Sequence, residues 1–291
     1  MIAPSDIPQA SDSVEAPNDL PEYAPMLAAY HRAHAAELRD MIGDLPVRLG
    51  DRVLDMPCGD GVYTVLLAEK VGSGGSVVGV DLSESYLAMA RMRAEQSTVG
   101  ARICFQAGDI AALPFDDNMF DLIWCAQSMY SLPDPIGALR ELRRVVRPGG
   151  TVAVFENDTL HQILLPWPAE LELAVRQAQL RSLAVRGPAT AKFFIGRDLR
   201  STFAVAGLEN SIVTPYTSIR HAPLSADERS YLAWYFAYVG THVRPYIQPE
   251  AGAWFKRLLD PTSVNYLLDQ PDFYVIYVDM VARGVKLRDR I

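Results

Sequence analysis

Three aspartates stand just after apolar runs, and they are the first residues in this sequence that could do chemistry. Asp55 follows "RVL", Asp81 follows "SVVGV" and Asp109 follows "ICFQAG". A carboxylate accepts hydrogen bonds from the hydroxyl and amino groups of a ligand. Asp55 also opens the turn "DMPCGDG", where Gly59 and Gly61 let the backbone pass close to a bound molecule. These residues predict a ligand-binding turn between a strand and a helix.

The chemistry of such a turn comes from the helix that follows it. The first backbone amides of a helix are unpaired donors with partial positive charge, which in dinucleotide enzymes meet a pyrophosphate. Asp81 lies 26 residues after Asp55, and an acid at this distance can accept hydrogen bonds from two ribose hydroxyls. Taken alone, "DLSES" could instead cap a helix, and the Gly-Asp pair at Asp109 could be a plain turn.

Pro57 stands where loops of this kind usually carry their first glycine. Proline fixes φ at about −65° and has no backbone N–H. We therefore expect the turn to bind a ligand only if Pro57 keeps a negative φ and no essential hydrogen bond needs its amide. The alternative is a degenerate turn that binds nothing.

The elements that must position these residues alternate between short apolar runs and helical periodicity. Strands are expected at 52–56, 76–82, 101–108, 120–127 and 151–157, and helices at 63–71, 83–97 (with Ser83 as N-cap) and 135–146, where "RPGG" (147–150) makes the turn into the fifth strand. Continuous apolar strands are typical of a parallel sheet with helices on both faces. The predicted fold is α/β, a doubly wound, Rossmann-like, seven-stranded and mostly parallel sheet with helical lid inserts.

The second half of the chain interrupts this alternation twice. A helix at 197–206 and strands at 210–219 and 272–284 continue the sheet, while helices are expected at 24–45, 169–185, 225–240 and 249–260. The predicted domains are a disordered tail (1–22), a helical flap (23–47), the core (48–157), a helical lid insert (158–196), a core continuation (197–221), an aromatic-rich helical insert (222–271) and the last strand with the C-terminus (272–291).

Composition excludes several classes of protein. The net charge of −8 gives no basic field for nucleic acid. The three cysteines, Cys58, Cys104 and Cys125, lie far apart, without the spacing of a metal site or a disulfide set, which suits a reducing cytoplasm. No apolar run reaches the roughly 18 residues of a membrane span. We therefore expect a cytoplasmic protein that binds no metal.

Several motifs in the same order resemble one known family, the class I S-adenosylmethionine-dependent methyltransferases. The likeness covers 48–157 well and returns at 197–219 and 272–284, and it is closest to the small-molecule branch that includes quinone and sterol methyltransferases. The resemblance implies S-adenosyl-L-methionine as cofactor and a methyltransferase of the EC 2.1.1 class. Transfer would be an in-line displacement that depends on positioning and on exclusion of water.

The resemblance also implies which residues bind the cofactor: Asp55, Pro57, Gly59, Gly61, Asp81, Leu82, Asp109, Ile110, Cys125 and Gln127. In the family the turn packs against the methionine part, and an acid at the position of Asp55 helps to fix the ammonium group. Asp81 would bind the ribose, with Leu82 beside the adenine. Asp109 would bind the adenine amino group, and Ile110 would pack on the ring.

The segment "CAQSMYSLPD" (125–134) lies where family members bind the methyl acceptor. Backbone atoms near Cys125 would meet the methionine end, and Gln127, Tyr130 and Ser131 could face the acceptor. Many relatives have His-His in place of Tyr130 and Ser131. A general base is needed only if the acceptor must lose a proton. The candidates for a catalytic role are His31, His161 and Tyr130, the two histidines because they lie where lids of this family close.

The segment 231–246 holds six aromatic residues and permits three interpretations. It could be a helix buried against the sheet, an apolar wall for a small-molecule acceptor, or the contact face of a homodimer. The two inserts, 158–196 and 222–271, would select the acceptor because they lie where the alternation of the core is interrupted.

Three other functions remain open at this stage. A dehydrogenase is disfavoured because its G-x-G-x-x-G fingerprint lacks a third glycine here. A catalytically inactive S-adenosylmethionine-binding protein with a regulatory role is motivated by Pro57 and by the missing His-His pair. An enzyme that uses the same cofactor for non-methyl chemistry could be separated only by analysis of its products.

Overall fold

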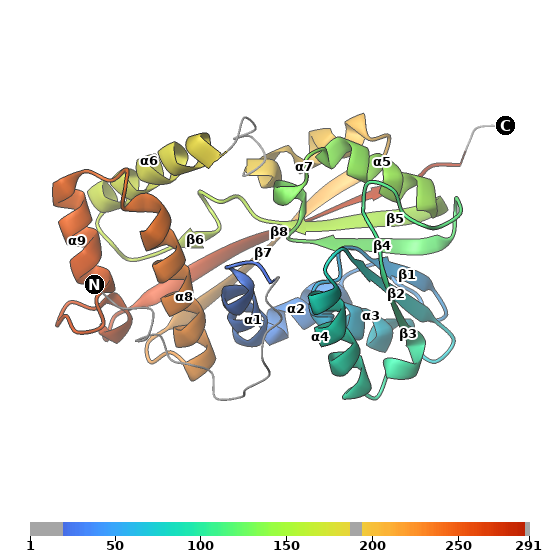
Figure 1. Ribbon diagram of the computed structural model, residues 1–291, viewed down its shortest axis with the longest axis horizontal. Coiled ribbons are helices and arrows are strands. Elements are labelled where there is room, and N and C mark those ends of the chain that lie inside the picture. Colours follow the sequence, from blue (N-terminus) through green and yellow to red (C-terminus); the bar gives the residue numbers. More distant parts are fainter. Residues whose placement is uncertain (1–19, 187–193, 289–291) are drawn as a thin grey trace. The chain divides into compact units, whose positions relative to one another are not determined.

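The computed structural model describes residues 20–186 and 194–288 (Figure 1). The strands are β1 (Arg52–Asp55), β2 (Ser76–Asp81), β3 (Ile103–Ala107), β4 (Phe120–Ala126), β5 (Val146–Glu156), β6 (Ile163–Leu164), β7 (Glu209–His221) and β8 (Tyr274–Val285). The helices are α1 (Ala24–Ala33), α2 (Ala35–Gly43), α3 (Val62–Val71), α4 (Glu84–Glu95), α5 (Pro135–Val145), α6 (Ala169–Arg186), α7 (Ile195–Val205), α8 (Ala226–Val243) and α9 (Pro249–Leu259).

The strands form a sheet of the order β3-β2-β1-β4-β5-β8-β6, with β7 paired to β8. Strands β1 to β5 pair with one another in parallel, whereas β8 is antiparallel to β5 and β6. The predicted α/β fold with a mostly parallel sheet is therefore confirmed, and the two-residue β6 is an addition to the seven predicted strands. Helices α5 and α7 lie on one side of these strands, and α2, α3 and α4 on the other (Figure 1).

Side-chain caps fix where several helices begin. The Ser83 hydroxyl accepts from the Tyr86 amide at the start of α4, which confirms the predicted N-cap. Asp134 caps α5 in the same way, ahead of Pro135 at the first helical position. Ser225 and Glu228 form a capping box at the start of α8. These caps explain why the predicted starts of the three helices agree with the structure to within a residue.

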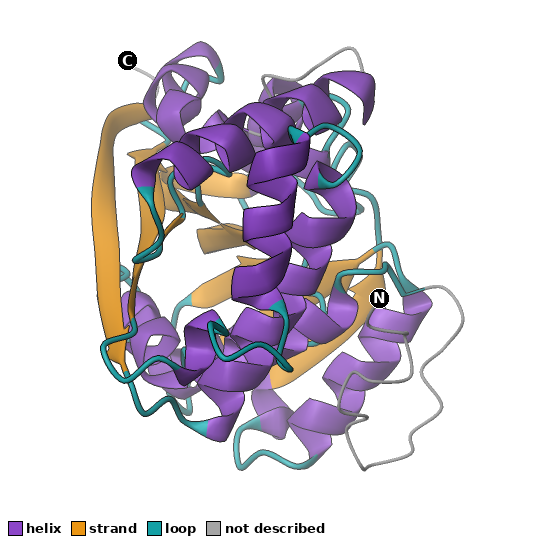
Figure 2. Cartoon of the chain, turned by 90° about the vertical axis from the view of Figure 1, so that its left-hand side faces the viewer, coloured by secondary structure: helices purple, strands orange, loops and turns teal. Residues whose placement is uncertain are grey.

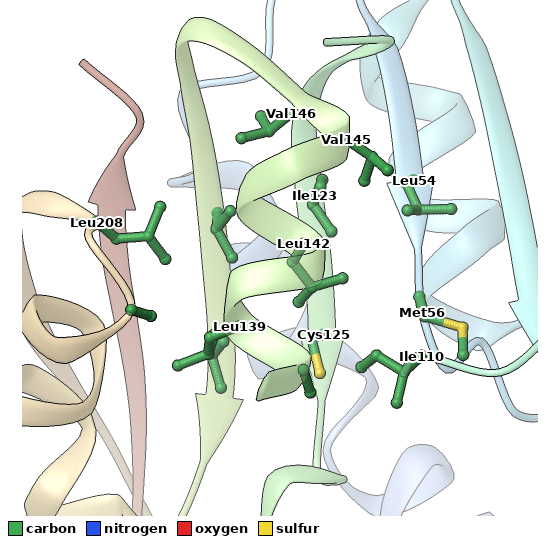
Figure 3. Close-up of a cluster of buried hydrophobic side chains, with 14 of the residues drawn as sticks. Leu54, Met56, Ile110, Ile123, Cys125, Leu139, Leu142, Val145, Val146 and Leu208 are labelled. Carbon is green, nitrogen blue, oxygen red and sulfur yellow. The ribbon is translucent and has the colours of Figure 1, made fainter. Parts of the chain in front are cut away.

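A large apolar cluster joins the sheet to α5 and α7 (Figure 3). The cluster includes Leu54, Ile123 and Cys125 from the strands and Leu139 and Leu142 from α5. Packing on this scale is the main favourable term that holds helices against a sheet. It also fixes the strand ends from which the polar residues of the site project.

The described residues form two compact units. The first contains 20–33, 165–186 and 219–275, and the second contains 34–164, 194–218 and 276–288. Within the first unit α1 packs against α8, where the Tyr30 and Tyr231 ring centroids lie 5.4 Å apart, edge to face. Tyr235 and Phe236 on α8 are also buried. These aromatic side chains therefore support the interpretation of 231–246 as a mostly buried helix, although here it packs with helices. Figure 2 shows the helices and strands by colour.

Two expectations about elements are wrong. The helix expected at 24–45 is two helices, since the backbone at His34 (φ −115°, ψ 19°) leaves the helical region between α1 and α2. The "RPGG" segment (147–150) lies inside β5 rather than before it. The pairing of β4 with β5 is irregular there, because Phe120 pairs with Val146 but Leu122 pairs with Thr151. Apolar periodicity does not register a break of one residue or a bulge.

The predicted disordered tail lies, up to residue 19, outside the described residues. Among the residues that the structure describes, no helix is long and apolar enough to cross a membrane. Nor does this part of the chain bring three or more His, Cys, Asp or Glu side chains together as a metal site.

Leu142→Ala should destabilise the protein by about 2–5 kcal/mol, because it leaves a cavity under α5 where the side chain is fully buried. Chemical denaturation measures the change. Leu49, which is 83% exposed, is the matched control, and Leu49→Ala should change the free energy of unfolding by less than about 0.5 kcal/mol. Equal losses in both variants would contradict the placement of this core.

Candidate functional site

The carboxyl ends of β1, β2, β4 and β5 lie at one edge of the sheet, because these neighbouring strands are parallel. Ligands of open α/β sheets bind at this edge. The edge carries the turn after β1, Asp81 at the end of β2 and the loops after β4 and β5. The structure therefore brings most of the predicted site residues to one place within the second unit.

Pro57 does not disrupt the turn after β1. The Met56 amide donates to the Trp124 carbonyl (2.9 Å) and the Cys58 amide donates to the Val80 carbonyl (2.8 Å), so the residues on both sides of Pro57 are anchored to neighbouring strands. Of the described residues other than glycine, only Asn118, Gln127 and Asn210 have a positive φ, so Pro57 keeps a negative one. The turn is therefore formed with Pro57 in place, and the negative φ meets the first of the two conditions for a ligand-binding turn.

The two glycines of the turn serve different purposes. Both have positive φ, +51° at Gly59 and +79° at Gly61. A Cβ at Gly61 would lie 2.9 Å from Ala90 Cβ, so Gly61 allows the turn to pack against α4. A Cβ at Gly59 would meet nothing within 4 Å. Gly59 therefore leaves open space beside the turn, as a bound ligand would require.

Asp81 is buried and holds the turn from the end of β2. Its Oδ2 accepts from the Gly59 amide (2.8 Å) and its Oδ1 accepts from the Ser83 amide (3.0 Å). Burial raises the pKa of this carboxyl, and the hydrogen bonds from Ser83 and Gly59 oppose that rise. Each oxygen can accept a second hydrogen bond, so Asp81 can still bind two ligand hydroxyls.

Asp55 is fully buried and only half satisfied. Its Oδ2 accepts from the Thr64 hydroxyl (2.5 Å), while Oδ1 has no hydrogen-bond partner among the described residues. Burial raises the pKa of Asp55 to about 8, the bond from Thr64 lowers it in part, and the charges of Asp81 and Asp60 raise it further. A buried acceptor without a partner fits a positively charged group of a ligand.

Arg93 stabilises the same turn, and no sequence motif indicated this role. From α4 its Nε donates to the Asp60 carbonyl (2.9 Å) and its Nη2 to Asp60 Oδ2 (2.7 Å). The two residues are 33 positions apart, and only the packing of α4 beside α3 brings them together. This pair fixes the backbone between Cys58 and Gly61.

The residues predicted to contact the adenine differ in exposure. Leu82 is 68% exposed, so its side chain is available to a flat ring. Asp109 is exposed as well, and its Oδ1 accepts from the Ala111 amide (2.9 Å). Ile110, in contrast, is buried in the apolar cluster near Met56 (Figure 3). Little of the Ile110 side chain is left to pack on a ligand.

The loop after β4 contains a backbone strain. Gln127 has φ +50°, which is uncommon outside glycine, and its amide donates to the Phe155 carbonyl (2.8 Å). The Cys125 side chain points into the apolar cluster (Figure 3), and burial raises the pKa of its thiol, so only its backbone can meet a ligand. Tyr130, in the short helix η3 (Met129–Ser131), is half-buried against the cluster.

Glu156 anchors this loop and was missed by the sequence analysis. Its Oε1 accepts from the Ser128 amide (2.7 Å) and the Met129 amide (2.6 Å). Burial raises its pKa to about 8, and the backbone hydrogen bonds oppose that rise. Glu156 ends the apolar run "VAVFE" as Asp55 and Asp81 end theirs. The same pattern, an acid at the end of an apolar run, therefore indicates Glu156 as well as the two aspartates.

The two candidate histidines lie in different units. His161 follows β5 in the second unit, where its Nδ1 lies 3.2 Å from Asp158 Oδ1. His31 is buried on α1 in the first unit, with its ring 6.0 Å from that of Tyr30. Within the second unit the structure brings His161 and Tyr130, but not His31, to the loops at the carboxyl edge.

Comparisons with known proteins show which proteins the chain is similar to. A family model described as "Methyltransferase domain" matches residues 48–190. The chain is 37% identical over 132 residues to the 27-O-demethylrifamycin SV methyltransferase of Amycolatopsis mediterranei, a match that covers 45% of this chain and 46% of that one. It thus spans about half the length of that relative.

A second relative is covered more fully. The chain is 31% identical over 198 residues to the demethylmenaquinone methyltransferase of Shouchella clausii, which covers 63% of this chain and 81% of that one. Among solved structures, the YcgJ protein from Bacillus subtilis aligns with a TM-score of 0.55 at 17% identity, over 88% of this chain and 100% of that one. This last likeness concerns the fold alone.

The raised pKa of Asp55 predicts how stability depends on pH. A carboxyl with a pKa of about 8 in the folded chain and 3.8 in the unfolded chain binds more protons when folded. The free energy of unfolding therefore falls as the pH rises between these values. Asp55→Asn should remove up to about 1.4 kcal/mol per pH unit of that slope and be more stable than the wild type at pH 9.

Denaturation of the ligand-free protein at a series of pH values checks this. Asp116→Asn, at an exposed aspartate, is the control and should keep the wild-type slope. An unchanged slope in Asp55→Asn would mean that Asp55 is ionised in the folded protein at neutral pH.

Proposed function

Because this chain belongs to the class I S-adenosylmethionine-dependent methyltransferases, we propose that it transfers a methyl group to a small, partly apolar acceptor. The observation that best supports the proposal is the turn 55–61. Among the residues that the structure describes, one buried carboxylate oxygen of Asp55 has no hydrogen-bond partner there, and no atom lies within 4 Å of where a Cβ at Gly59 would be. An ammonium group would satisfy the first feature, and a ligand chain would occupy the second.

In the proposed site, Asp55 would bind the ammonium group and Asp81 the two ribose hydroxyls. Leu82 would cover one face of the adenine, and Asp109 would accept from its amino group. Pro57, Gly59 and Gly61 shape the turn, and the backbone from Cys125 to Gln127 would border the methionine end. Ile110 would contribute only indirectly, because its side chain is buried in the apolar cluster.

The cofactor would supply a methyl group bound to a positively charged sulfur, and this sulfur is a good leaving group in an in-line displacement. The chain's own residues then have to hold the acceptor about 3–3.5 Å from that carbon and exclude water. Arg93 fixes the turn on the cofactor side through Asp60. Glu156 fixes the loop with Tyr130 on the other side through two backbone amides. Rigid placement on both sides is the contribution that this structure supports.

We infer that the acceptor is a small molecule of the kind named for the two relatives, a quinone or a polyketide such as rifamycin. We propose that the inserts 158–196 and 222–271 select it. Methyl transfer to a panel of quinols and hydroxylated polyketides, measured directly, identifies the acceptor and the atom that is methylated. Binding of S-adenosylhomocysteine without any transfer would favour the inactive binding protein instead.

Asp81→Ala should weaken the binding of S-adenosylhomocysteine by roughly 1.5–3 kcal/mol, the range for hydrogen bonds that involve a charged group. Isothermal titration calorimetry measures the dissociation constant, and circular dichroism checks that the variant is folded. Asp116→Ala is the matched control and should bind as the wild type does. If the folded Asp81→Ala variant bound equally tightly, the proposed place of the ribose would be wrong.

A further inference from the structure

A pocket of about 310 Å³ lies beyond the carboxyl end of β5 and is lined by Asp158, His161, Arg197, Val278 and Met280. All five residues belong to the second unit. Met280 pairs with Glu156 across β5 and β8, and the Phe155 carbonyl accepts from the Gln127 amide at the end of β4. The pocket is therefore at the same edge of the sheet as the loop that carries Tyr130.

Asp158 is the buried centre of the charged residues in this pocket. Its Oδ1 accepts from the Leu160 amide (3.0 Å) and lies 3.2 Å from His161 Nδ1, and its Oδ2 accepts from Arg197. Burial alone would raise the pKa of Asp158, but the hydrogen bonds from Arg197 and His161 outweigh it and hold that pKa below its usual range. Asp158 is therefore an ionised acceptor and not a base.

The contact with Asp158 favours the tautomer of His161 that carries its proton on Nδ1. Asp158 Oδ1 can only accept, so the contact at 3.2 Å is a hydrogen bond when Nδ1 is protonated. Arg197 Nη2 also approaches Nδ1 (3.4 Å), but the shorter contact of this guanidinium is with the Asp158 carboxylate. With the proton on Nδ1, the neutral imidazole has its lone pair on Nε2. The ring is 72% exposed, so a ligand can reach Nε2.

Arg197 holds this pair in place from the first turn of α7. Its guanidinium binds Asp158 and stacks over the Phe194 ring, 5.2 Å from the centroid. Asp198, the neighbouring acid on α7, adds its charge near Arg197. Because Arg197 neutralises Asp158, the pair presents one uncharged imidazole nitrogen to the pocket and not a negative charge.

We propose that His161, oriented by Asp158 and Arg197, is the base that removes the proton from a phenol-type hydroxyl of the acceptor. The inference rests on the proposed methyl transfer and deepens it. Val278 and Met280 supply an apolar wall for a flat ring, and a methionine sulfur packs well against aromatic edges. An oriented carboxylate–imidazole pair is useful for an acceptor that must lose a proton to become a nucleophile.

In this step the acceptor hydroxyl gives its proton to Nε2 and keeps the electron pair of the broken O–H bond. Its oxygen forms the bond to the methyl carbon as the carbon–sulfur bond breaks, and the sulfur retains that electron pair. Asp158 stabilises the imidazolium that results. Water accepts the proton afterwards, which returns His161 to its neutral form.

The first test measures which ring nitrogen of His161 carries the proton. In protein labelled with ¹⁵N and saturated with S-adenosylhomocysteine, long-range ¹H–¹⁵N spectra should show His161 protonated at Nδ1 and not at Nε2, with the His161→Gln spectrum for assignment. Added 1-naphthol should shift the Nε2 resonance. An Nε2-protonated ring, or no shift at saturating 1-naphthol, would overturn the proposal.

The second test separates a base from a merely structural residue. Methyl transfer to 1-naphthol should fall by about 10²–10⁴-fold in kcat in His161→Gln, with KM within about twofold. Transfer to 4-nitro-1-naphthol, used at a pH where it is already ionised, should fall far less. Asp158→Asn should lower kcat with 1-naphthol in the same direction. His221→Gln, the same change at an exposed histidine, is the control and should change neither rate.

The outcomes distinguish this inference from the proposed function. If S-adenosylhomocysteine does not bind the wild type, the proposed function fails. If it binds but the wild type methylates neither naphthol, or if His161→Gln loses activity equally with both, the role of His161 is wrong and the cofactor site stands.

Discussion

The burial of carboxylates at the ends of parallel strands is the constraint on which the site depends. An ionised carboxyl is costly in a low-dielectric interior unless hydrogen bonds or a positive charge compensate it. Asp81 obtains its compensation from the backbone amides of Gly59 and Ser83. Within the described part of the chain, Asp55 accepts one side-chain hydrogen bond, from Thr64, and its other carboxylate oxygen has no partner. The turn after β1 therefore lies beside a buried carboxyl group whose negative charge is only partly compensated, and a cationic ligand could complete the compensation.

The same principle applies to the loops after β4 and β5, where each acid is compensated in a different way. Glu156 is compensated by the amides of the loop after β4, so its burial fixes the position of that loop. Asp158, two residues later, is compensated by Arg197 and His161 and stays ionised. Two acids that are two residues apart thus have different tasks, since Glu156 holds the backbone of a loop and Asp158 orients an imidazole.

Local pattern was sufficient for much of the fold and for part of the site. Apolar runs predicted β1, β2 and β4 to within a residue, because a buried parallel strand must be continuously apolar. Ser83 was predicted as a cap, because the cap depends on residues only three apart. His34 and the bulge in β5 were not, since they change the backbone without changing the periodicity. The N-terminal segment was thus expected as one helix and is two.

The sequence by itself determined the order of strands and helices along the chain, the Gly-rich turn and the acids that end β1 and β2, because each is a property of neighbouring residues. Only the tertiary structure decided that Arg93 binds Asp60, that Gly61 serves helix packing while Gly59 borders open space, and that Arg197 and His161 meet on Asp158. These contacts join residues from different elements. Their partners are chosen by packing, which no local spacing encodes.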